Sequence, residues 1–518
     1  MSGNTAVNRG WKETLLSWTH PRAVAMLFLG FSAGLPILLI FSTLSLWLRE
    51  AGVSRSAVTF FSWAALGYSF KFLWAPLIDC LPVPWLTRLV GRRRSWLLVA
   101  QLGIIVSICL MGTVDPANQG NSLIFMAIGA VMLGFSSATQ DIVIDAYRIE
   151  SVDESMQAML ASMYIAGYRI GMLVAGAGAL YLASWFGTSS EQYVYNSWRM
   201  TYLAMAAVMS VGVVTTIIIK EPKTQSAIAK KDYTPQQYSR ILILFACAVF
   251  SFAMTFFYSG DFVAELKTDI VGLYPLSGKV IGFLLEVTRF ACSVVVAVIV
   301  AAALISSSMI EKGIVVETYV APILDFFKRY GLKTALLLLL LIGCYRISDI
   351  VLGVISNVFY ADMGYSKNEI ATITKTFGLG MTILGGFLGG FMTYRYGVYV
   401  ILFLGALLTA GTNLLFMTLA EAGADTLLLT VVIAADNLSA GIAATAFVAF
   451  LSSLTNISFT ATQYAIFSSL MTLFPKLLGG YSGTMVTAIG YQQFFLITAV
   501  MGIPVLILVW LAKKMVEG

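Results

Sequence analysis

Long apolar runs, interrupted only by short polar turns, follow one another from Ala23 almost to the C-terminus. The runs at 95–112 and 332–343 lack the strict alternation of polar and apolar positions that transmembrane strands show, which excludes a membrane barrel. Apolar stretches of about 20 residues are typical of membrane-spanning helices. The pattern therefore predicts an all-α polytopic membrane protein.

The apolar runs, bounded by charged residues, Pro and Gly, predict fourteen spans in three groups. Six come first, at about 23–47, 58–79, 95–113, 122–147, 157–183 and 199–219. Two follow, at about 240–258 and 281–310, and six more lie at about 335–361, 368–391, 397–418, 426–451, 459–480 and 490–512. We expect a six-helix bundle in 1–219, a second one in 335–518, and between them a segment, 220–334, that contains a polar linker, two extra helices and an interfacial helix.

The turn between the first two spans has a similar sequence in both six-helix groups. Residues 52–55 (GVSR) recur 312 positions later as residues 364–367 (GYSK), each with an aliphatic residue three positions further on, Val58 and Ile370. A six-helix repeat that runs parallel to itself is the plan of alternating-access carriers with the major facilitator fold, whose substrate site lies between the halves at the midplane. Chance similarity of two short turns is the alternative; the equal number of helices in the two groups favours the repeat.

Composition and charge narrow the class of protein further. With 59% hydrophobic and 11% charged residues, the chain is too apolar for a soluble globular protein. The net charge of +6 comes from basic residues spread over many short loops, so no basic domain is available to bind nucleic acid. The five cysteines are odd in number and dispersed, which argues against a disulfide framework and a metal site.

The basic residues also predict the orientation in the membrane. With the N-terminus in the cytoplasm, most Lys and Arg residues fall on the cytoplasmic side, as the positive-inside rule requires. Those that fall outside are Arg49, Arg55, Arg199, Lys267, Lys279, Lys367 and Lys476. Both termini are then cytoplasmic, and the first helix is expected to remain as an anchor because the first apolar run is too long for a signal peptide.

Two carboxylates stand at the charged end of the fourth span. Asp141 and Asp145 are four residues apart and therefore share one helix face. Because an ionised carboxylate is costly in hydrocarbon, this face must look into the protein interior or a water-filled path. A substrate pathway and a charge latch between helices are equally compatible with this position.

Five further charged residues, Lys71, Arg169, Arg346, Asp349 and Asp436, lie deep within spans. Counting 1.5 Å per residue puts the three cations roughly 12–18 Å from the nearest helix end, close to the bilayer centre. They are expected to face one another or water across the two halves, either as a transport pathway or as a structural ion-pair network, and we favour the pathway. In the extra helices, Arg289 can pair with Glu286 three residues away.

Short motifs in both halves combine charged, aromatic and small residues. In the first half they are residues 70–79 (FKFLWAPLID), 91–98 (GRRRSWLL), 139–146 (TQDIVIDA) and 167–173 (GYRIGML). In the second half they are 320–322 (VAP), 325–327 (DFF), Tyr345-Arg346 with Asp349, 375–376 (KT), 445–449 (TAFVA), Asn456 and 458–465 (SFTATQYA). Together these motifs resemble the AmpG family of muropeptide permeases.

The resemblance implies a major facilitator fold and the import of N-acetylglucosaminyl-1,6-anhydro-N-acetylmuramyl sugars, with or without their stem peptide, from periplasm to cytoplasm for cell-wall recycling. It also implies uptake driven by the proton gradient. Two features depart from the family pattern. The extra helices lie between the halves rather than after them, and Asp436-Asn437 stands where the family has Glu-Asn.

The same resemblance suggests roles for individual residues. Asp79 with Arg92, Arg93 and Arg94 is similar to the cytoplasmic latch of major facilitators, to which we add Asp145 and Arg148 as gating residues. Anhydromuramyl compounds carry carboxylates, which suit deep cations beside aromatic rings. The residues expected to bind the substrate are Lys71, Tyr68, Tyr168, Arg169, Arg346, Lys375, Gln140 and Asn437.

Proton coupling is expected to use a carboxylate. The single histidine, His20, precedes the first span and cannot serve as a relay within the membrane. Asp436 is the first choice because Arg346 can hold Asp349 ionised; Asp349 and then Asp141 follow. No metal and no cofactor besides the proton gradient are expected.

Other functions are weighed against this one. Acetyl-CoA transporters share the Lys–Trp–Pro–Asp and Gln–Asp signatures, so a carrier for a CoA ester or another anionic solute is the alternative. An enzyme is disfavoured because the sequence has no H-E-x-x-H motif and its one histidine, His20, lies before the first span. The expected location is the bacterial inner membrane, and the expected partners are a small sugar-peptide substrate, protons and membrane lipid, with no nucleic acid and no protein partner.

Overall fold

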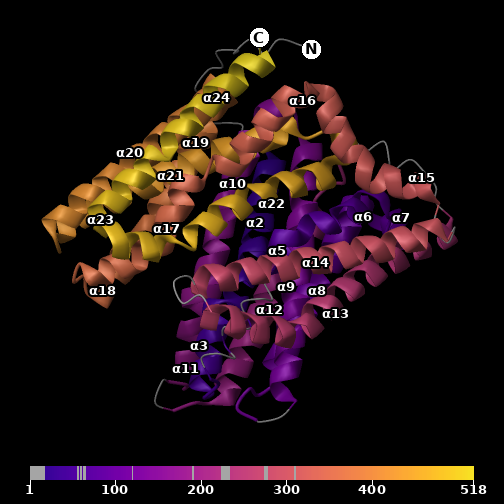
Figure 1. Ribbon diagram of the computed structural model, residues 1–518, viewed down its shortest axis with the longest axis horizontal. Coiled ribbons are helices and arrows are strands. Elements are labelled where there is room, and N and C mark those ends of the chain that lie inside the picture. The colour runs from indigo at the N-terminus through magenta and orange to yellow at the C-terminus, as the bar shows by residue number, and fades with distance from the viewer. Residues whose placement is uncertain are drawn as a thin grey trace. The chain divides into compact units, whose positions relative to one another are not determined.

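The computed structural model describes residues 18–54, 58, 61, 66–118, 121–189, 192–222, 234–273, 278–307 and 311–517. The chain divides into two compact units. The first comprises Met1–Ile228 and Phe326–Gly518, and the second comprises Ala229–Asp325. Figure 1 shows that the described elements are helices, which confirms the predicted all-α fold class.

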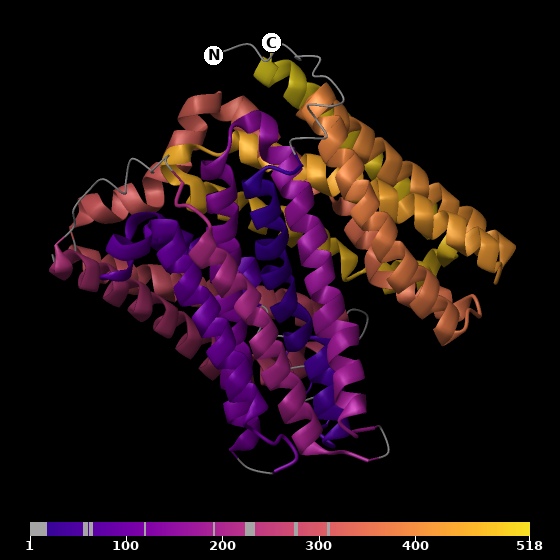
Figure 2. The ribbon, with the colours of Figure 1, turned by 180° about the vertical axis from the view of Figure 1, so that it is seen from behind.

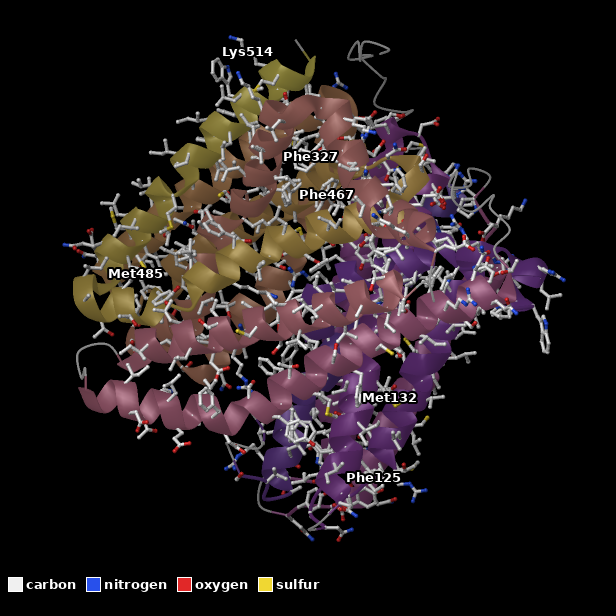
Figure 3. All side chains as sticks on the ribbon, turned by 45° about the vertical axis from the view of Figure 1, so that its right-hand side comes forward. Phe125, Met132, Phe327, Phe467, Met485 and Lys514 are labelled. Carbon is white, nitrogen blue, oxygen red and sulfur yellow. The ribbon has the colours of Figure 1, made fainter. Side chains whose placement is uncertain are left out.

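The first half of the larger unit contains the first six predicted spans. Its elements are α2 (Pro21–Ile40), α3 (Ser42–Glu50), α5 (Leu66–Phe70), η2 (Lys71–Leu73), α6 (Ala75–Cys80), α7 (Leu86–Val90), α8 (Arg92–Gly112), α9 (Ser122–Ser151), η3 (Glu154–Met156), α10 (Gln157–Leu173), η4 (Val174–Gly178), α11 (Ala179–Trp185) and α12 (Tyr195–Ile218). Apolar side chains such as Phe125 and Met132 are exposed on α9 (Figure 3), as expected for a helix in contact with lipid. Part of the predicted span 58–79 lies outside the described residues, and so does Arg55 in the turn before it.

The second half begins with a kinked helix. Its elements are α16 (Ala321–Cys344), α17 (Ile347–Asp362), α18 (Lys367–Glu369), η8 (Ile370–Phe377), α19 (Gly378–Tyr396), α20 (Val398–Ala422), α21 (Thr426–Leu454), η9 (Ile457–Phe459), α22 (Thr460–Gly479), α23 (Ser482–Val500) and α24 (Gly502–Glu517). Gly331 has a φ of 71° and divides α16 into two helical segments, the first of which covers part of the predicted interfacial helix. Gly490, with a φ of 78°, divides α23 in the same way. Both values lie in the left-handed region that favours glycine.

The smaller unit holds the two extra helices, α13 (Pro235–Leu273) and α14 (Gly278–Ser306), followed by α15 (Lys312–Val315) and η7 (Val316–Val320). Helix α13 is longer than the predicted span 240–258. Arg289 forms the expected ion pair with Glu286 at 3.1 Å, and its guanidinium also donates to the carbonyl oxygen of Phe256. The charge of Arg289 is thereby neutralised within the helix pair. Much of the polar linker that precedes α13 lies outside the described residues.

The number of spans is close to the prediction but not equal to it. Twelve helices in the described part of the chain are long and apolar enough to cross a membrane. The predicted spans 58–79 and 459–480 are not among them, although α22 is helical over Thr460–Gly479. The count of fourteen spans therefore stays a prediction.

Glycines bring α2 and α10 into close contact. A Cβ atom on Gly167 would lie 1.9 Å from the carbonyl oxygen of Leu27, and one on Gly30 would lie 2.2 Å from that of Tyr164. In the second half, a Cβ on Gly385 of α19 would lie 2.1 Å from the carbonyl oxygen of Leu438 on α21. Small residues allow this approach, which is the usual basis of helix packing in membranes. Each half therefore contains helix pairs that can move only as one body.

Candidate functional site

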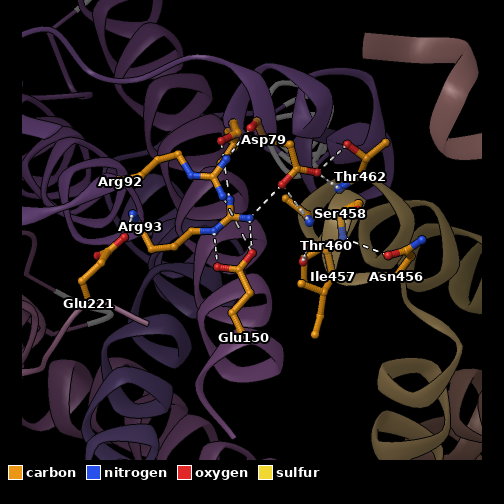
Figure 4. A network of polar contacts seen from close by, with 12 residues as sticks. Asp79, Arg92, Arg93, Glu150, Glu221, Asn456, Ile457, Ser458, Thr460 and Thr462 are labelled. Atoms are coloured by element: carbon orange, nitrogen blue, oxygen red, sulfur yellow. Dashed lines mark hydrogen bonds and ion pairs between the residues drawn. The ribbon is translucent and has the colours of Figure 1, made fainter. Parts of the chain in front are cut away.

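Asp79, at the C-terminal end of α6, binds the N-terminus of a helix in the other half. Its carboxylate accepts hydrogen bonds from the backbone N–H of Ala461 at 3.2 Å and of Thr462 at 2.8 Å. The hydroxyl of Thr462 donates a third, also at 2.8 Å. The first N–H groups of a helix have no partner within it and carry the positive end of the helix dipole, so a carboxylate there is stabilised. Asp79 thus caps α22 across the two halves (Figure 4).

Arg93 completes a buried charge network with Asp79. Its guanidinium lies 2.8 Å from Asp79 and 2.5 Å from Glu150, near the end of α9, and all three side chains are only 1% exposed. A second bond joins Arg93 Nε to Glu150 at 3.0 Å. Arg92 also lies 3.9 Å from Glu150, but Arg93 is the cation that contacts both carboxylates, so its removal would leave two buried negative charges poorly compensated. We call Asp79, Arg93, Glu150 and Thr462 the latch, and the end of the bundle where they lie the latch end.

The three consecutive arginines have separate roles. Arg92 donates to the backbone carbonyl of Asp79. Arg94 turns away and donates to the carbonyl oxygens of Thr216 and Ile217, at the C-terminal end of α12. The prediction that Arg92, Arg93 and Arg94 act together as a gate therefore needs refinement, because only Arg93 bonds the carboxylate that reaches the other half.

Glu221 caps the N-terminus of α8 beside the latch. Its carboxylate accepts hydrogen bonds from the backbone N–H of Arg93 at 2.8 Å and of Arg94 at 3.1 Å. Burial raises the pKa of Glu221, and these two bonds act against that shift. Gly91 makes the arrangement possible: its φ is 94°, and a Cβ atom there would lie 2.5 Å from the Glu221 side chain.

Arg148 makes a second polar link between the halves. Its guanidinium donates to the hydroxyl of Ser452, at the end of α21, at 2.8 Å, and lies 5.2 Å from the ring centroid of Tyr464 on α22. Within its own half it pairs with Asp145 at 3.4 Å and bonds Gln157 at 3.2 Å. The structure thus brings the predicted gating residues Asp145 and Arg148 together.

Lys71, predicted to bind substrate, is 7% exposed and lies with the gating residues. Its ammonium group is 3.8 Å from the carboxylate of Asp145. Asp141 accepts a long hydrogen bond of 3.5 Å from the Tyr164 hydroxyl. In this conformation Lys71 therefore belongs to a buried charge cluster near the latch end.

Two other predicted ligands of the first half are also occupied or buried. Tyr68 bonds the hydroxyl of Ser137 at 2.6 Å. Gln140 is fully buried, and neither polar atom of its amide has a hydrogen-bond partner among the described residues. Tyr168 is partly exposed, with its ring 6.0 Å from that of Tyr164. A buried amide without hydrogen bonds costs free energy. A new hydrogen bond to Gln140, formed when the helices move, would therefore be more stabilising than one to Tyr68 or Tyr168.

Direct contacts between the halves gather at the latch end. Helix α10 contacts α19 and α21, and α22 contacts α5, η2, α6 and α9. A Cβ atom on Gly390 of α19 would lie 2.7 Å from the hydroxyl oxygen of Ser162 on α10, so these helices touch closely. Figure 2 shows the two halves meeting along these helices and separating towards the other end of the bundle, here called the far end.

Arg346 and Asp349 form an ion pair of 2.5 Å at the start of α17. Both side chains are about one-third exposed, at 31% and 29%. Arg169, on α10 in the other half, is near enough for its charge to interact with both. Arg169 itself forms no ion pair among the described residues, and its side chain only contacts the sulfur of Met172 at 3.9 Å. Arg169 and Arg346 therefore lie within electrostatic range of each other, and among the described residues only Arg346 is in an ion pair with a carboxylate.

The remaining predicted residues lie on neighbouring helices of the second half. Asp436 accepts a hydrogen bond from Thr412 at 3.1 Å and lies within electrostatic range of Asp349. The amide of Asn437 is occupied by Thr382 and by the carbonyl oxygen of Ile433. Lys375 donates to the amide oxygen of Asn357 at 2.8 Å.

Several functional candidates escaped the sequence analysis. Glu150, Glu221, Ser452 and Thr462 complete the contacts of predicted residues but stand outside the charged stretches that drew attention. Lys476, which the predicted topology counts on the outer side, is not among the predicted ligands. It lies in α22, and the chain resumes as α23 at Ser482, whose hydroxyl donates to the carbonyl oxygen of Val351 in α17.

Comparison with known proteins agrees with this architecture. The family model of the Major Facilitator Superfamily matches residues 23–344. The transporter AmpG 4 of Rickettsia felis is 30% identical over 494 residues, which cover 95% of this chain and 97% of that protein. The anhydromuropeptide permease of Escherichia coli K12 is 28% identical over 507 residues, covering 98% of this chain and 82% of that protein. The chain therefore belongs to the major facilitator superfamily and, within it, to the AmpG-type transporters.

Solved structures share the fold at low sequence identity. The E. coli fucose:proton symporter FucP matches with a TM-score of 0.61 and 11% identity, over 96% of this chain and 99% of that one. The proton:xylose symporter XylE matches with a TM-score of 0.56 and 13% identity, over 96% of both chains. This membership makes the protein a multi-pass membrane transporter.

Proposed function

We propose that the protein imports anhydromuropeptides, N-acetylglucosaminyl-1,6-anhydro-N-acetylmuramyl sugars with or without a stem peptide, from periplasm to cytoplasm for peptidoglycan recycling. The relatives named above support a substrate of this class, since one of them is an anhydromuropeptide permease. The substrate is a carboxylate-bearing sugar of moderate size. The location is then the bacterial inner membrane, with both termini in the cytoplasm, as the distribution of basic residues favours.

The observation that carries the proposal is the approach of Arg169 to Arg346 from opposite halves. Two like charges within spans repel each other, and Asp349 neutralises only one of them. A carboxylate of the substrate that binds between the two arginines would supply the missing negative charge and hold both halves together. The bound substrate would thus relieve the repulsion between the two arginines and favour the conformation in which the two halves enclose it.

Alternating access accounts for where the halves touch. With the latch end in the cytoplasm, the contacts of Asp79 and Arg148 with the second half close the cytoplasmic side. The described conformation is then the outward-facing one, ready to receive substrate from the periplasm. Rocking of the halves would break these contacts and release substrate inside.

Proton symport is the proposed energy source, with Asp436 as the carrier of the proton. Asp349 is held by Arg346, whereas Asp436 has a hydroxyl partner and forms no ion pair in the described part of the chain. A carboxylate without a cation can change protonation as its surroundings change between the two openings. Asp349 and Asp141 are the second and third candidates.

The test is functional replacement. A bacterium that lacks its own muropeptide permease, supplied with this chain, should accumulate radiolabelled anhydromuropeptide, and a protonophore should abolish the accumulation. A matched strain with an empty vector gives the background. Normal membrane insertion without uptake of any anhydromuropeptide would refute the proposal.

A further inference from the structure

Helix irregularities in the second half occur where basic side chains stand. The backbone is interrupted between α16 and α17 at Tyr345–Arg346. Lys375 lies in η8, an eight-residue π-helix. Lys476 follows Pro475 near the break between α22 and α23. Broken helices and π-turns within membranes are commonly associated with binding sites, because they expose backbone and re-aim side chains.

Contacts between α17 and α22 fix the depth of Lys476. Gly343, just before α17, faces Leu470 of α22, and Gly479 faces Val354, so the two helices run in the same direction. Lys476 then lies level with the first turn of α17, and its charge is close enough to Arg346 to repel it. Arg169, Arg346 and Lys476 together form the inner level of cations.

A second, outer level lies further along α17. Asn357 is eight residues beyond Asp349, a spacing that advances about 12 Å along the helix and turns about 80° around it. The side chain of Asn357 is exposed and accepts the hydrogen bond of 2.8 Å from Lys375. The outer level, Lys375 with Asn357, is therefore nearer the far end than the inner level.

Carboxylates of the protein do not balance these cations. Among the described residues, Asp349 is the one carboxylate in an ion pair with any of the four. Lys375 has a neutral amide as partner, and Lys476 is exposed without an ion pair or side-chain hydrogen bond in that part of the chain. Nearer the far end, Asp362 and Glu369 already accept hydrogen bonds from Tyr491 and Thr426. Cations within a span that lack partners usually mark a path for anions.

We infer that the second half carries two anion subsites about 12 Å apart, and that Lys375, positioned by Asn357, recognises a second, distal carboxylate of the substrate. The inference rests on the proposed function and deepens it. A peptide-free anhydromuramyl sugar has one carboxylate, on its lactyl group, and needs only the inner level. In the peptide-bearing form that carboxyl is an amide, and several carboxylates lie along the peptide, so both levels can be used at once. The outer level thus favours solutes that carry two separated carboxylates.

The experiment compares two radiolabelled probes in cells without their own permease: the peptide-free disaccharide and the same disaccharide with a tripeptide. For each variant the measured quantity is the ratio of tripeptide-bearing to peptide-free uptake at low concentration. Lys375→Gln should lower this ratio about ten-fold, the loss expected for one charge-assisted hydrogen bond. Lys476→Gln should lower uptake of both probes. Asn357→Asp should act like Lys375→Gln, because it places a carboxylate against the lysine and cancels its charge without removing it.

Controls separate recognition from folding. Lys375→Arg keeps the charge and should retain most of the wild-type ratio, and Lys513→Gln, an exposed lysine in α24, should match the wild type. An unchanged ratio in Lys375→Gln, or an equal loss for both probes, would overturn the outer subsite. A wild-type chain that transports some other anion but neither probe would instead refute the proposed function.

Discussion

The carboxylate of Asp79 receives the backbone N–H of Thr462 at 2.8 Å, although the two residues are 383 positions apart and belong to different halves. The bond joins a side chain at the end of one helix to the free N-terminus of another. Its strength depends on a fixed charge meeting a fixed dipole, and both are lost when the halves separate. The contact is therefore a natural determinant of which side of the carrier is open.

Replacement of Asp79 by Ala should open the latch end. The change leaves Arg93 with one carboxylate and α22 without its cap, and breaking such a buried pair costs about 3–5 kcal/mol. Ser162, buried between α10 and α19, supplies the readout. A Cys at position 162, in a chain without reactive native cysteines, should react with a membrane-permeant maleimide faster in the Asp79→Ala background. Equal labelling rates in both backgrounds would show that Asp79 does not hold the halves together.

Arg93 and Arg94 should differ in their effect on transport. Arg93→Gln removes the closest cation from both Asp79 and Glu150 and leaves Glu150 only the 3.9 Å pair with Arg92, whereas Arg94→Gln removes bonds to carbonyl oxygens at the end of α12. Both variants should slow transport without abolishing substrate binding, and Arg93→Gln should slow it more. Arg88→Gln, on an exposed side chain of α7, is the matched control. Loss of substrate binding in Arg93→Gln would place this residue in the binding site.

Arg169→Ala and Arg346→Ala should each weaken uptake of anionic substrate while the protein still inserts into the membrane. A hydrogen bond to a charged group contributes about 1.5–3 kcal/mol, so a rise in KM of ten-fold or more is expected. Arg346→Ala should be the more harmful because it also leaves Asp349 without its ion pair. Initial uptake rates over a range of substrate concentrations measure the effect. A well-inserted variant with a normal KM would remove that arginine from the site.

Asp436→Asn should abolish uphill accumulation and preserve exchange of substrate. The amide resembles the protonated carboxyl and can still accept from Thr412, but it cannot release a proton. Proton-driven uptake and counterflow are measured side by side for Asp436→Asn, Asp349→Asn and Asp141→Asn. If the Asp436→Asn carrier still concentrates substrate with a proton gradient, the proton is carried elsewhere.

Gly167→Ala should destabilise the first half, whereas Gly353→Ala should be tolerated. A Cβ atom on Gly167 would lie 1.9 Å from a backbone oxygen of α2, but one on Gly353 meets no atom within 4 Å. Overpacking of this kind costs about 1–3 kcal/mol or more. Thermal unfolding of the two purified variants in detergent gives the comparison. A Gly167→Ala protein as stable as Gly353→Ala would mean that α2 and α10 can move apart without loss.

The fold class followed from the sequence because apolar length and the absence of alternation decide between helices and strands. The resemblance to a known family led to the part of the latch formed by Asp79 and Arg93, which the structure brings together. Thr462 stands in the motif 458–465 quoted for the resemblance, but its bond to Asp79 could not be predicted, since a contact between distant segments leaves no local pattern in the chain.

Depth counting identified charged residues but not their directions. It placed Lys71 and Arg169 at similar depths, yet Lys71 faces Asp145, whereas Arg169 lies near Arg346. Rotation about the helix axis decides this, and it depends on packing that residue counts do not contain.

The turn between α21 and α22 meets the first half at two points only ten residues apart, Ser452 with Arg148 and Thr462 with Asp79. A short, well-anchored segment cannot release one point and keep the other while its half rotates as a rigid body. Both hydrogen bonds must break in the same movement, so neither bond stabilises a partly open conformation. If the halves rock as proposed, the result is an all-or-none gate, which would prevent a leak of ions at partly open stages of the cycle.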